Sequence, residues 1–333
     1  MIEGSNMPQQ RSWVATVLAW LLLLGIVGLT TISLLTSRYG WKIYLEIFSH
    51  FQLQYFILSF LGLIALALTR CPRPFLLGLL CTALLGTQLA TWYWPPRFIL
   101  SRGNSNFRIL IANVNTQNQQ YEEVFTFARE TNPDLALFME VDETWVNQLN
   151  RLSSELPYSS HRANPYNLGL ALYSRYVLGN TQLQFFGDDG NPSITGNITV
   201  NGKTYAFVGT HPLPPAKFSF FHARNRQLDQ IGQYLQTIEK PQILMGDLNL
   251  TMWSPYYKRL IGQTGLKNAR KGFGILPSWP TQGTYSQMPD WAPLLFSIPI
   301  DHCLLTPDIE VVNVRVGPNL GSDHRPVMID LRL

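Results

Sequence analysis

Acidic, amide and imidazole side chains recur at the ends of short apolar runs in the C-terminal two-thirds of this chain. Asn113 follows the run at 109–112, and Glu140 follows the run at 135–139. One such residue alone is more often a turn or cap residue than a functional one. Here six predicted strand ends carry them: Asn113, Glu140, His211, Asp247 with Asn249, Asp301 with His302, and Asp323 with His324. If these strands are neighbours, the side chains form one polar cluster of the kind from which sheet proteins build sites.

The residue types limit the chemistry of this cluster. Carboxylate and amide oxygens are hard ligands that suit Mg²⁺ or Mn²⁺. Zinc would call for more histidines or cysteines at closer spacing, and the three cysteines, Cys71, Cys81 and Cys303, lack it. The sequence has no Gly-x-Ser-x-Gly or P-loop signature. A divalent cation beside Asp–His pairs therefore indicates attack of water on a phosphorus centre.

The order of these motifs resembles the endonuclease/exonuclease/phosphatase superfamily over residues 107–333. The most specific motifs are Gly246-Asp247-Leu248-Asn249 and Ser322-Asp323-His324-Arg325-Pro326. The weaker ones are Asn113-Val114-Asn115, Met139-Glu140-Val141, Gly209-Thr210-His211 and Ile300-Asp301-His302. The resemblance implies a four-layer α/β/β/α sandwich and a metal-dependent phosphoric ester hydrolase.

The resemblance also implies a metal site. By it, Glu140 binds the catalytic Mg²⁺ or Mn²⁺, and Asn113 lies beside the ion. Asp323 is a further metal-site or supporting carboxylate.

The same resemblance implies the catalytic roles. Asp247 would orient or deprotonate the attacking water, and Asn249 would contact the phosphate in the transition state. Asp301 would orient His324, while His324 and His211 would bind the scissile phosphate. Members of the family differ in which residue is named the general base, so that assignment stays open here.

Two arginines stand near the start of a predicted helix at about 221–237. We predict that Arg226 contacts the substrate phosphate. Arg224 is the neighbouring candidate for that contact, and the alternative for both residues is a solvated helix face.

The chain departs from the family pattern in ways that suggest a particular branch. Ala112 and Met139 replace a Trp and a Gln that often precede the first Asn and the Glu, and His302 replaces an aromatic residue common in DNA-repair members. The segments Pro299–His302, Thr210–Pro215 and Trp279-Pro280 resemble the membrane-bound bacterial branch that includes teicoplanin-resistance-like proteins. In that branch the hydrolase domain is expected outside the cytoplasmic membrane, acting on lipid-linked or other envelope phosphates.

The elements that must position these residues are mostly strands. Apolar runs predict strands at 108–114, 134–141, 168–173, 194–200, 204–210, 242–245, 300–305, 310–316 and 327–331. Asn201-Gly202 predicts a hairpin turn, and a helix is predicted at 121–130. Strands joined by both hairpins and helices favour a layered α/β sandwich over a purely parallel sheet.

The first 102 residues have a different composition. The chain is 46% hydrophobic and 14% charged, whereas about 25% charged is usual for a soluble domain. Apolar runs at about 13–35, 52–69 and 75–94 predict three transmembrane helices, with Trp92, Tyr93 and Trp94 as an interfacial belt. We therefore predict a membrane anchor at 1–102 and a hydrolase domain at 103–333. The expected location is the cell membrane, as a multi-pass protein.

The side of the membrane on which the hydrolase domain lies is not decided by charge. Arginines and lysines flank the predicted spans on both sides, and large domains cross a membrane largely regardless of charge. Three spans place the two chain ends on opposite sides. The external face is preferred here because of the resemblance to the membrane-bound branch.

Two other functions are weighed against the envelope phosphatase. A nuclease needs phosphate neutralisation by Lys and Arg, but residues 103–333 hold 18 basic and 19 acidic residues, a net charge of −1. An inactive binding domain would be expected to lack at least one of Glu140, Asp247, Asn249 or His324, and all are present. The predicted partners are therefore a lipid bilayer and a phosphorylated, possibly lipid-linked substrate. Nucleic acid is the second choice, and no protein partner is predicted.

Overall fold

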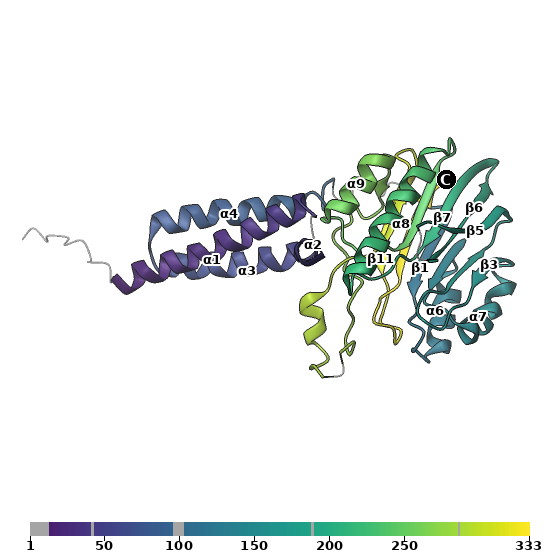
Figure 1. Cartoon of the computed structure of the whole chain (residues 1–333), viewed down its shortest axis with the longest axis horizontal. Helices are drawn as coiled ribbons and strands as arrows, with labels where there is room; N and C mark the ends of the chain where they lie inside the picture. The colour runs from purple at the N-terminus through teal and green to yellow at the C-terminus, as the bar shows by residue number, and fades with distance from the viewer. Residues whose placement is uncertain (1–12, 41–42, 96–102, 188–189, 286) are drawn as a thin grey trace, which may run out of the picture.

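The computed structural model describes residues 13–40, 43–95, 103–187, 190–285 and 287–333. It consists of a long N-terminal helical bundle and a two-sheet body at one end of that bundle (Figure 1). Residue 102, the predicted end of the N-terminal region, lies outside the described ranges, as do residues 1–12.

The bundle consists of three long helices and a short one. These are α1 (Trp13–Arg38), α2 (Ile43–Phe48), α3 (Gln52–Leu68) and α4 (Pro72–Ala90). By length and composition, α1 with 26 residues and α4 with 19 could cross a membrane, whereas α3 has 17 residues and is shorter. All three predicted apolar helices are therefore present, but the described part of the chain holds two candidate spans instead of the three that were predicted.

The bundle buries hydrogen-bonded polar side chains among apolar ones and exposes apolar side chains on its outside. The buried Ser33 donates to the buried Gln52, and the buried hydroxyls of Ser59 and Thr82 lie 2.7 Å apart. Leu24, in the middle of α1, is 68% exposed. Its outer surface differs from that of an amphipathic helix bundle in water, whose polar face points outward.

The body contains two six-stranded sheets. The first has the order β11-β12-β1-β2-β4-β3, and the second has the order β5-β6-β7-β8-β10-β9. The strands of the first sheet are β1 (Phe107–Asn113), β2 (Leu135–Met139), β3 (Tyr158–Arg162), β4 (Leu170–Ser174), β11 (Glu310–Val316) and β12 (Val327–Arg332). Those of the second are β5 (Leu178–Phe185), β6 (Pro192–Val200), β7 (Lys203–Thr210), β8 (Gln242–Asp247), β9 (Lys267–Asn268) and β10 (Asp301–Leu305).

Helices cover the outer face of each sheet and complete four layers. Apolar side chains of α6 (Tyr121–Thr131) and α7 (Glu143–Leu149) pack on the first sheet, together with the short helix η1 (Asn150–Ser154). Those of α8 (Phe218–Gln236) and α9 (Pro255–Thr264) pack on the second. Between the sheets lies a core of buried apolar residues that includes Ile109, Leu137, Phe207 and Met245. The predicted α/β/β/α sandwich is confirmed by these three cores.

Strand pairing brings the predicted polar residues to one edge of the sandwich. The strands β1 and β2 are parallel, with Asn113 opposite Met139, so Asn113 and Glu140 emerge together. The strands β7 and β8 are also parallel, and β8 pairs with antiparallel β10 so that Asp247 lies opposite Asp301. The carboxyl ends of four strands and the start of a fifth therefore meet at this edge.

Candidate active site

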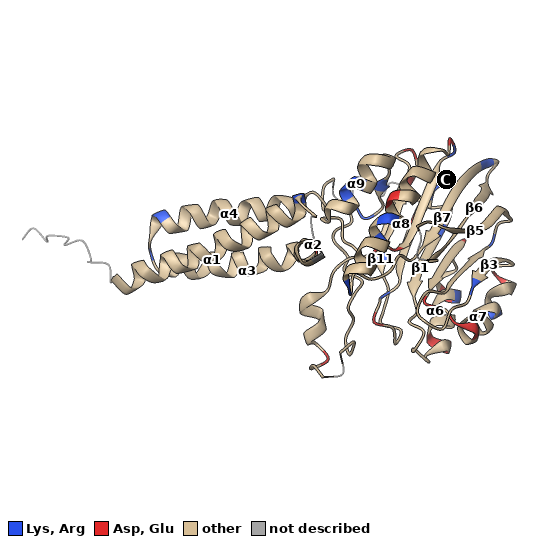
Figure 2. Ribbon diagram, viewed as in Figure 1, with Lys and Arg blue, Asp and Glu red and all other residues tan. Residues whose placement is uncertain are grey.

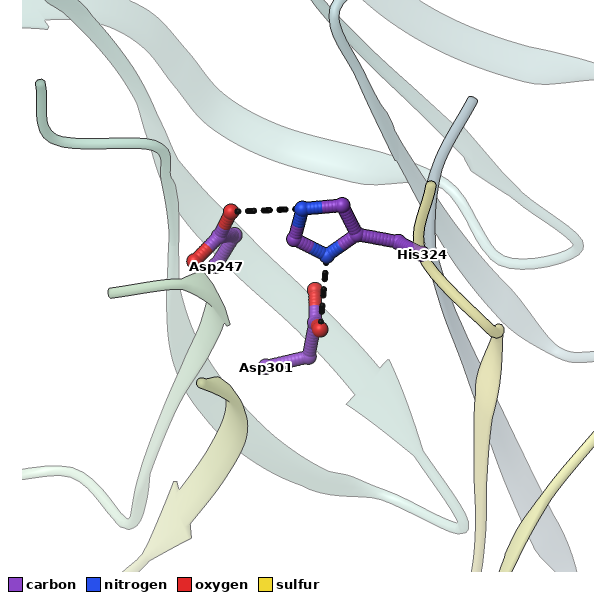
Figure 3. A group of neighbouring side chains, drawn as sticks. All are labelled: Asp247, Asp301 and His324. Atoms are coloured by element: carbon purple, nitrogen blue, oxygen red, sulfur yellow. Dashed lines mark hydrogen bonds and ion pairs between the residues drawn. The ribbon is translucent and has the colours of Figure 1, made fainter. Parts of the chain in front are cut away.

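Two aspartates and a histidine form the centre of the site (Figure 3). The Nδ1 atom of His324 lies 3.0 Å from Oδ2 of Asp301, and its Nε2 atom lies 3.5 Å from Oδ2 of Asp247. All three residues are buried, and their potential ligand atoms lie within 4.8 Å of one another. The imidazole is thereby held between two carboxylates that come from adjacent strands, β8 and β10.

The position of Asp247 depends on the glycine before it. Gly246 has φ +145°, and a Cβ atom there would meet the carbonyl oxygen of Thr210 at 1.8 Å. Only glycine allows the strands β7 and β8 to approach so closely at this point. The Oδ1 atom of Asp247 then accepts the backbone N–H of Asn249 at 2.8 Å, which fixes the direction of its other oxygen.

Three further predicted residues surround Oδ2 of Asp247. The Asn113 amide donates to Oε1 of Glu140 at 2.8 Å and to Oδ2 of Asp247 at 3.4 Å. The Nε2 atom of His211 lies 3.5 Å from the same Asp247 oxygen and 3.9 Å from Glu140. The structure thus brings together Asn113, Glu140, His211, Asp247, Asp301 and His324 as one cluster.

Two residues at the site, one in the cluster and one beside it, hold a left-handed backbone. Glu140 has φ 59° and Asn249 has φ 51°. For a residue other than glycine this conformation costs on the order of 1–3 kcal/mol, and such residues gather at functional sites. The carbonyl oxygens of Glu140 and Asn249 accept hydrogen bonds from Thr116 and from Arg224, and these contacts support the strained turns.

The acidic and imidazole groups of the site shift one another's pKa values. Burial would lower the pKa of His324, but the carboxylates of Asp301 and Asp247 outweigh it and raise that pKa to about 10. Burial would likewise lower the pKa of His211, and Asp247 and Glu140 raise it above its usual range. Burial raises the pKa of Glu140, although both imidazoles oppose that shift. The raised pKa of His324 favours its protonated form in this arrangement, with one ring nitrogen facing each carboxylate.

The donor set fits a hard divalent cation on the side of Glu140. The side chains of Asp247, Asp301 and His324 lie close enough together to hold a metal ion. Both ring nitrogens of His324 already face carboxylate oxygens, however, which favours hydrogen bonding by this ring over metal ligation. The oxygens near Glu140, Asn113 and Asp247 are of the kind that Mg²⁺ and Mn²⁺ prefer. In addition, Oδ1 of Asp301 is buried and has no hydrogen-bond partner among the described residues.

Asp323 lies at the margin of the cluster and is held by two donors. Its Oδ1 atom accepts from the Asn115 amide at 2.8 Å, and its Oδ2 atom accepts from the Trp279 indole at 3.1 Å. The Trp279 ring also packs 6.3 Å from the His324 ring, centroid to centroid. Trp279 and Asn115 are therefore parts of the site for which the sequence analysis gave no role.

The remaining predicted residues, Asn249, Arg226 and His302, lie in different surroundings. Asn249 is half-buried, and its side-chain amide donates to the carbonyl oxygen of Pro212 at 2.9 Å. Arg226 is exposed on α8, whereas Arg224 on the same helix is fully buried. His302 is buried below the site, where Nδ1 faces the Asn268 amide at 3.0 Å and Nε2 faces the Leu250 carbonyl oxygen at 2.9 Å. Its role is thus structural support of the strand end.

Carboxylates and imidazoles at the strand ends of a two-sheet α/β sandwich define the phosphoesterase and nuclease class of folds. The chain belongs to the Endonuclease/Exonuclease/phosphatase family, whose family model matches residues 110–324. Members of this family are typically hydrolases, and they usually use divalent metals. No match is found among curated proteins.

Solved structures of several relatives share this fold. TDP2 of D. rerio, complexed with a single-strand DNA product, is 14% identical with a TM-score of 0.58, covering 68% of this chain and 99% of that one. An endonuclease/exonuclease/phosphatase from Beutenbergia cavernae is 18% identical with a TM-score of 0.55, covering 69% and 72%. One from Bacteroides vulgatus is 19% identical with a TM-score of 0.52, covering 68% and 98%. At these identities the likeness concerns the fold alone.

Proposed function

We propose that this protein is a membrane-anchored, Mg²⁺- or Mn²⁺-dependent hydrolase of phosphoester or phosphoanhydride bonds in lipid-linked or other envelope phosphates. The observation that carries the proposal is the buried Asp301–His324–Asp247 arrangement beside Glu140, Asn113 and His211. It combines a proton donor, a proton acceptor and hard oxygen ligands at one edge of the sandwich.

Different residues of the site would bind the metal and accept the proton. Glu140, with Asn113 beside it and Asp323 as a further carboxylate, would hold a divalent ion that offsets charge on the phosphoryl oxygens when bound. Asp247 would accept a proton from the attacking water, and the hydrogen bond from the Asn249 backbone N–H to its Oδ1 atom supports this role by fixing the carboxylate.

The histidines would act on the phosphate. Asp301 holds Nδ1 of His324, and Nε2 faces Oδ2 of Asp247, so this nitrogen would donate to a phosphoryl oxygen bound beside Asp247. His211 approaches the same place from β7. Both would donate to the charge that develops in the transition state, as would the Asn249 amide after releasing Pro212.

Membrane attachment is supported by the surface of the N-terminal helices. Apolar side chains cover the outside of the bundle and hydrogen-bonded polar side chains join its helices, as in helices packed in lipid. The proposed location is the cell membrane, with several spans and with the body on the external face. The span count and the orientation rest on the predicted runs and on the family branch.

An exposed apolar segment of the body supports a lipid-linked substrate. Trp291, Leu294, Leu295 and Phe296 are between 42% and 60% exposed, in and beside η2 (Ala292–Phe296). This segment meets the bundle, because the Gln54 amide donates to the Leu295 carbonyl oxygen at 3.1 Å. The loop that contains it begins near Trp279, which contacts Asp323. A lipid headgroup at the bundle end would thus be close to the site.

A nuclease is the competing function. The fold of a DNA-bound relative favours it, but basic and acidic residues are interspersed over the body without a basic face in the view of Figure 2. Nonspecific nucleic-acid binding depends on neutralising phosphates with Lys and Arg. The net charge of −1 over residues 103–333 gives that binding little support.

The test is hydrolysis by the purified full-length protein in detergent with Mg²⁺. Polyprenyl diphosphate and plasmid DNA are offered separately, with Glu140→Ala as the inactive control. Phosphate release from the lipid that is lost in Glu140→Ala, with intact plasmid, is the expected result. Metal-dependent nicking of the plasmid without lipid turnover would replace this proposal with the nuclease.

A further inference from the structure

A buried acidic residue of the N-terminal region lies against the body. Glu46, on the short helix α2, is fully buried. Its Oε2 atom lies 3.3 Å from the guanidinium of Arg224 on α8, and its Oε1 atom accepts from the Ser254 hydroxyl at 2.6 Å. Glu46 and Glu3 are the two acidic residues of the first 102. A carboxylate in such an apolar region needs these partners to stay charged.

Arg224 extends this contact to the loop that follows β8. Its guanidinium donates to the carbonyl oxygen of Asn249 at 2.8 Å, and Asn249 in turn fixes Asp247 through its backbone N–H. Because Arg224 is fully buried, water cannot take the place of Glu46 as a partner of its guanidinium. A chain of three contacts therefore connects helix α2 with the residue placed to accept the proton.

A second contact reaches the same loop. The Nδ1 atom of His50 lies 3.0 Å from the Thr251 hydroxyl and accepts the Thr251 backbone N–H at 3.4 Å. Its Nε2 atom lies 3.3 Å from Glu46. Ser254, which donates to Glu46, also caps helix α9. The catalytic loop, defined as residues 248–254, thus has backbone and side-chain partners that the body itself does not supply.

We propose that Glu46 and His50 are positioning residues for the catalytic loop, so that the N-terminal region completes the active site as well as attaching it. Removing one partner of a buried ion pair leaves an uncompensated charge, which the structure relieves by moving. Here the groups free to move are Arg224 and the Asn249 carbonyl oxygen. The loop that directs Asp247 and Asn249 would shift, whereas Asn113 and Glu140, at the strand ends of the first sheet, would not.

The alternative is that these contacts only attach the two regions to each other. Lys258 provides a matched control, because it donates to the Ser37 carbonyl oxygen of α1 at 2.7 Å from helix α9. That bond joins the same two regions but does not touch the catalytic loop. A purely structural role predicts similar behaviour for variants at Glu46 and at Lys258.

The experiment compares Glu46→Gln, Arg224→Met, their combination and Lys258→Met in the full-length protein. The activity readout rests on the proposed function and uses bis(p-nitrophenyl) phosphate with Mn²⁺ in detergent. Each of the first two variants should lower kcat by about 10²-fold with KM unchanged, the loss expected for a misplacement of about 1 Å. The combined variant should lose no more than the worse single one, because both act through one chain of contacts. Glu46→Asp, which keeps the charge, should restore part of the rate.

A second readout needs no substrate and separates this inference from the proposed function. Amide hydrogen exchange in residues 248–254 should be about tenfold faster or more in Glu46→Gln than in the wild type, and unchanged in Lys258→Met. If exchange is unchanged in both, the inference is wrong even if the enzyme is active. Equal losses of activity in Glu46→Gln and Lys258→Met, in proportion to lost folded protein, would also overturn it. If the wild type hydrolyses no phosphoester but exchange responds as expected, only the proposed function fails.

Discussion

The bundle and the body differ in which kinds of side chain they bury and which they expose. In the body, Ile109, Leu137 and Met245 are fully buried between two sheets, and most charged residues are exposed or half-buried. In the bundle, apolar residues such as Leu24 face outward, while Gln52 and Ser33 face each other inside. Water drives the first arrangement, because burial removes apolar surface from it. The second suits a surrounding that is as apolar as the side chains themselves.

The largest expected effect is a loss of activity, and it tests whether the chemistry takes place in the body. Asp247→Asn removes the proposed proton acceptor but keeps the shape of the side chain, so kcat should fall by about 10²–10⁴-fold. Steady-state rates with Mg²⁺ and circular dichroism of the same sample check this. The control is Asp308→Asn, which breaks an exposed pair with Lys203 and should leave the rate unchanged. A fully active Asp247→Asn protein would place the chemistry elsewhere.

The next effect tests the contact between the two regions. Burial would raise the pKa of Glu46, but His50 and Arg224 outweigh burial and lower that pKa from 4.5 to about 2. A lowered pKa means that this stabilisation is complete above about pH 4.5 and is lost as the pH falls toward 2. The shift of the Glu46 pKa corresponds to roughly 3–4 kcal/mol at most.

Thermal unfolding in detergent measures this acid response. The wild type should lose stability over that range more steeply than Glu46→Gln, which has no carboxyl group to titrate at this position. Parallel curves for the two proteins would show that the charge of Glu46 does not stabilise the contact.

A third prediction concerns the outer face of the bundle. Leu24→Lys places a charge at the middle of α1, where insertion into a bilayer should cost about 2.5–3.5 kcal/mol. The measurement is the fraction of protein that stays in the membrane after alkaline extraction. Tyr166→Lys is the matched control, since Tyr166 is 81% exposed on the body. Equal membrane fractions for both variants would contradict the contrast between the two surfaces.

The smallest effect concerns the inside of the bundle. Gln52→Leu removes its hydrogen bonds with Ser33, Ser37 and the Ser49 carbonyl oxygen. Because interhelical hydrogen bonds in lipid are worth about 0.6–1.7 kcal/mol, the unfolding free energy should fall by that amount. Leu137→Ala in the body should cost more, about 2–5 kcal/mol. A reversed order, by denaturant titration in detergent, would mean that the bundle depends on its polar interior.

Much of the site could be predicted because local signals determine it. Asn113, Glu140 and Asp247 each end an apolar strand, and parallel pairing of β1 with β2 and of β7 with β8 places them together. The Asn201-Gly202 turn was also correct, since both residues have positive φ between β6 and β7. The roles assigned to these residues remain predictions.

Other features depend on distant partners and could not be predicted locally. The strand β3 is mostly exposed and polar, and its pairing with β4 alone determines it. The strand β9 has two residues, too few for a pattern. The contact of Glu46 with Arg224 joins residues far apart in sequence, and no local pattern indicates it.

One signal for Arg224 was present in the sequence. Arg224 shares the buried stripe of α8 with Leu228, Ile231 and Leu235, at a helical spacing of three to four residues. Arg226, two positions away, faces another direction and is exposed. The helical phase therefore identifies Arg224 as the inward arginine, whereas the sequence analysis committed to Arg226 as the phosphate ligand.

The hydrogen bonds between body and bundle have a kinetic consequence. Lys258 with Ser37, Tyr256 with Gly40 and Gln54 with Leu295 hold the body directly at the end of the helices. In the proposed membrane setting, an enzyme fixed in this way meets its substrate by lateral diffusion in the plane of the bilayer. Its rate would then follow the mole fraction of substrate in the surface, and dilution with inert lipid would slow it even at constant bulk concentration.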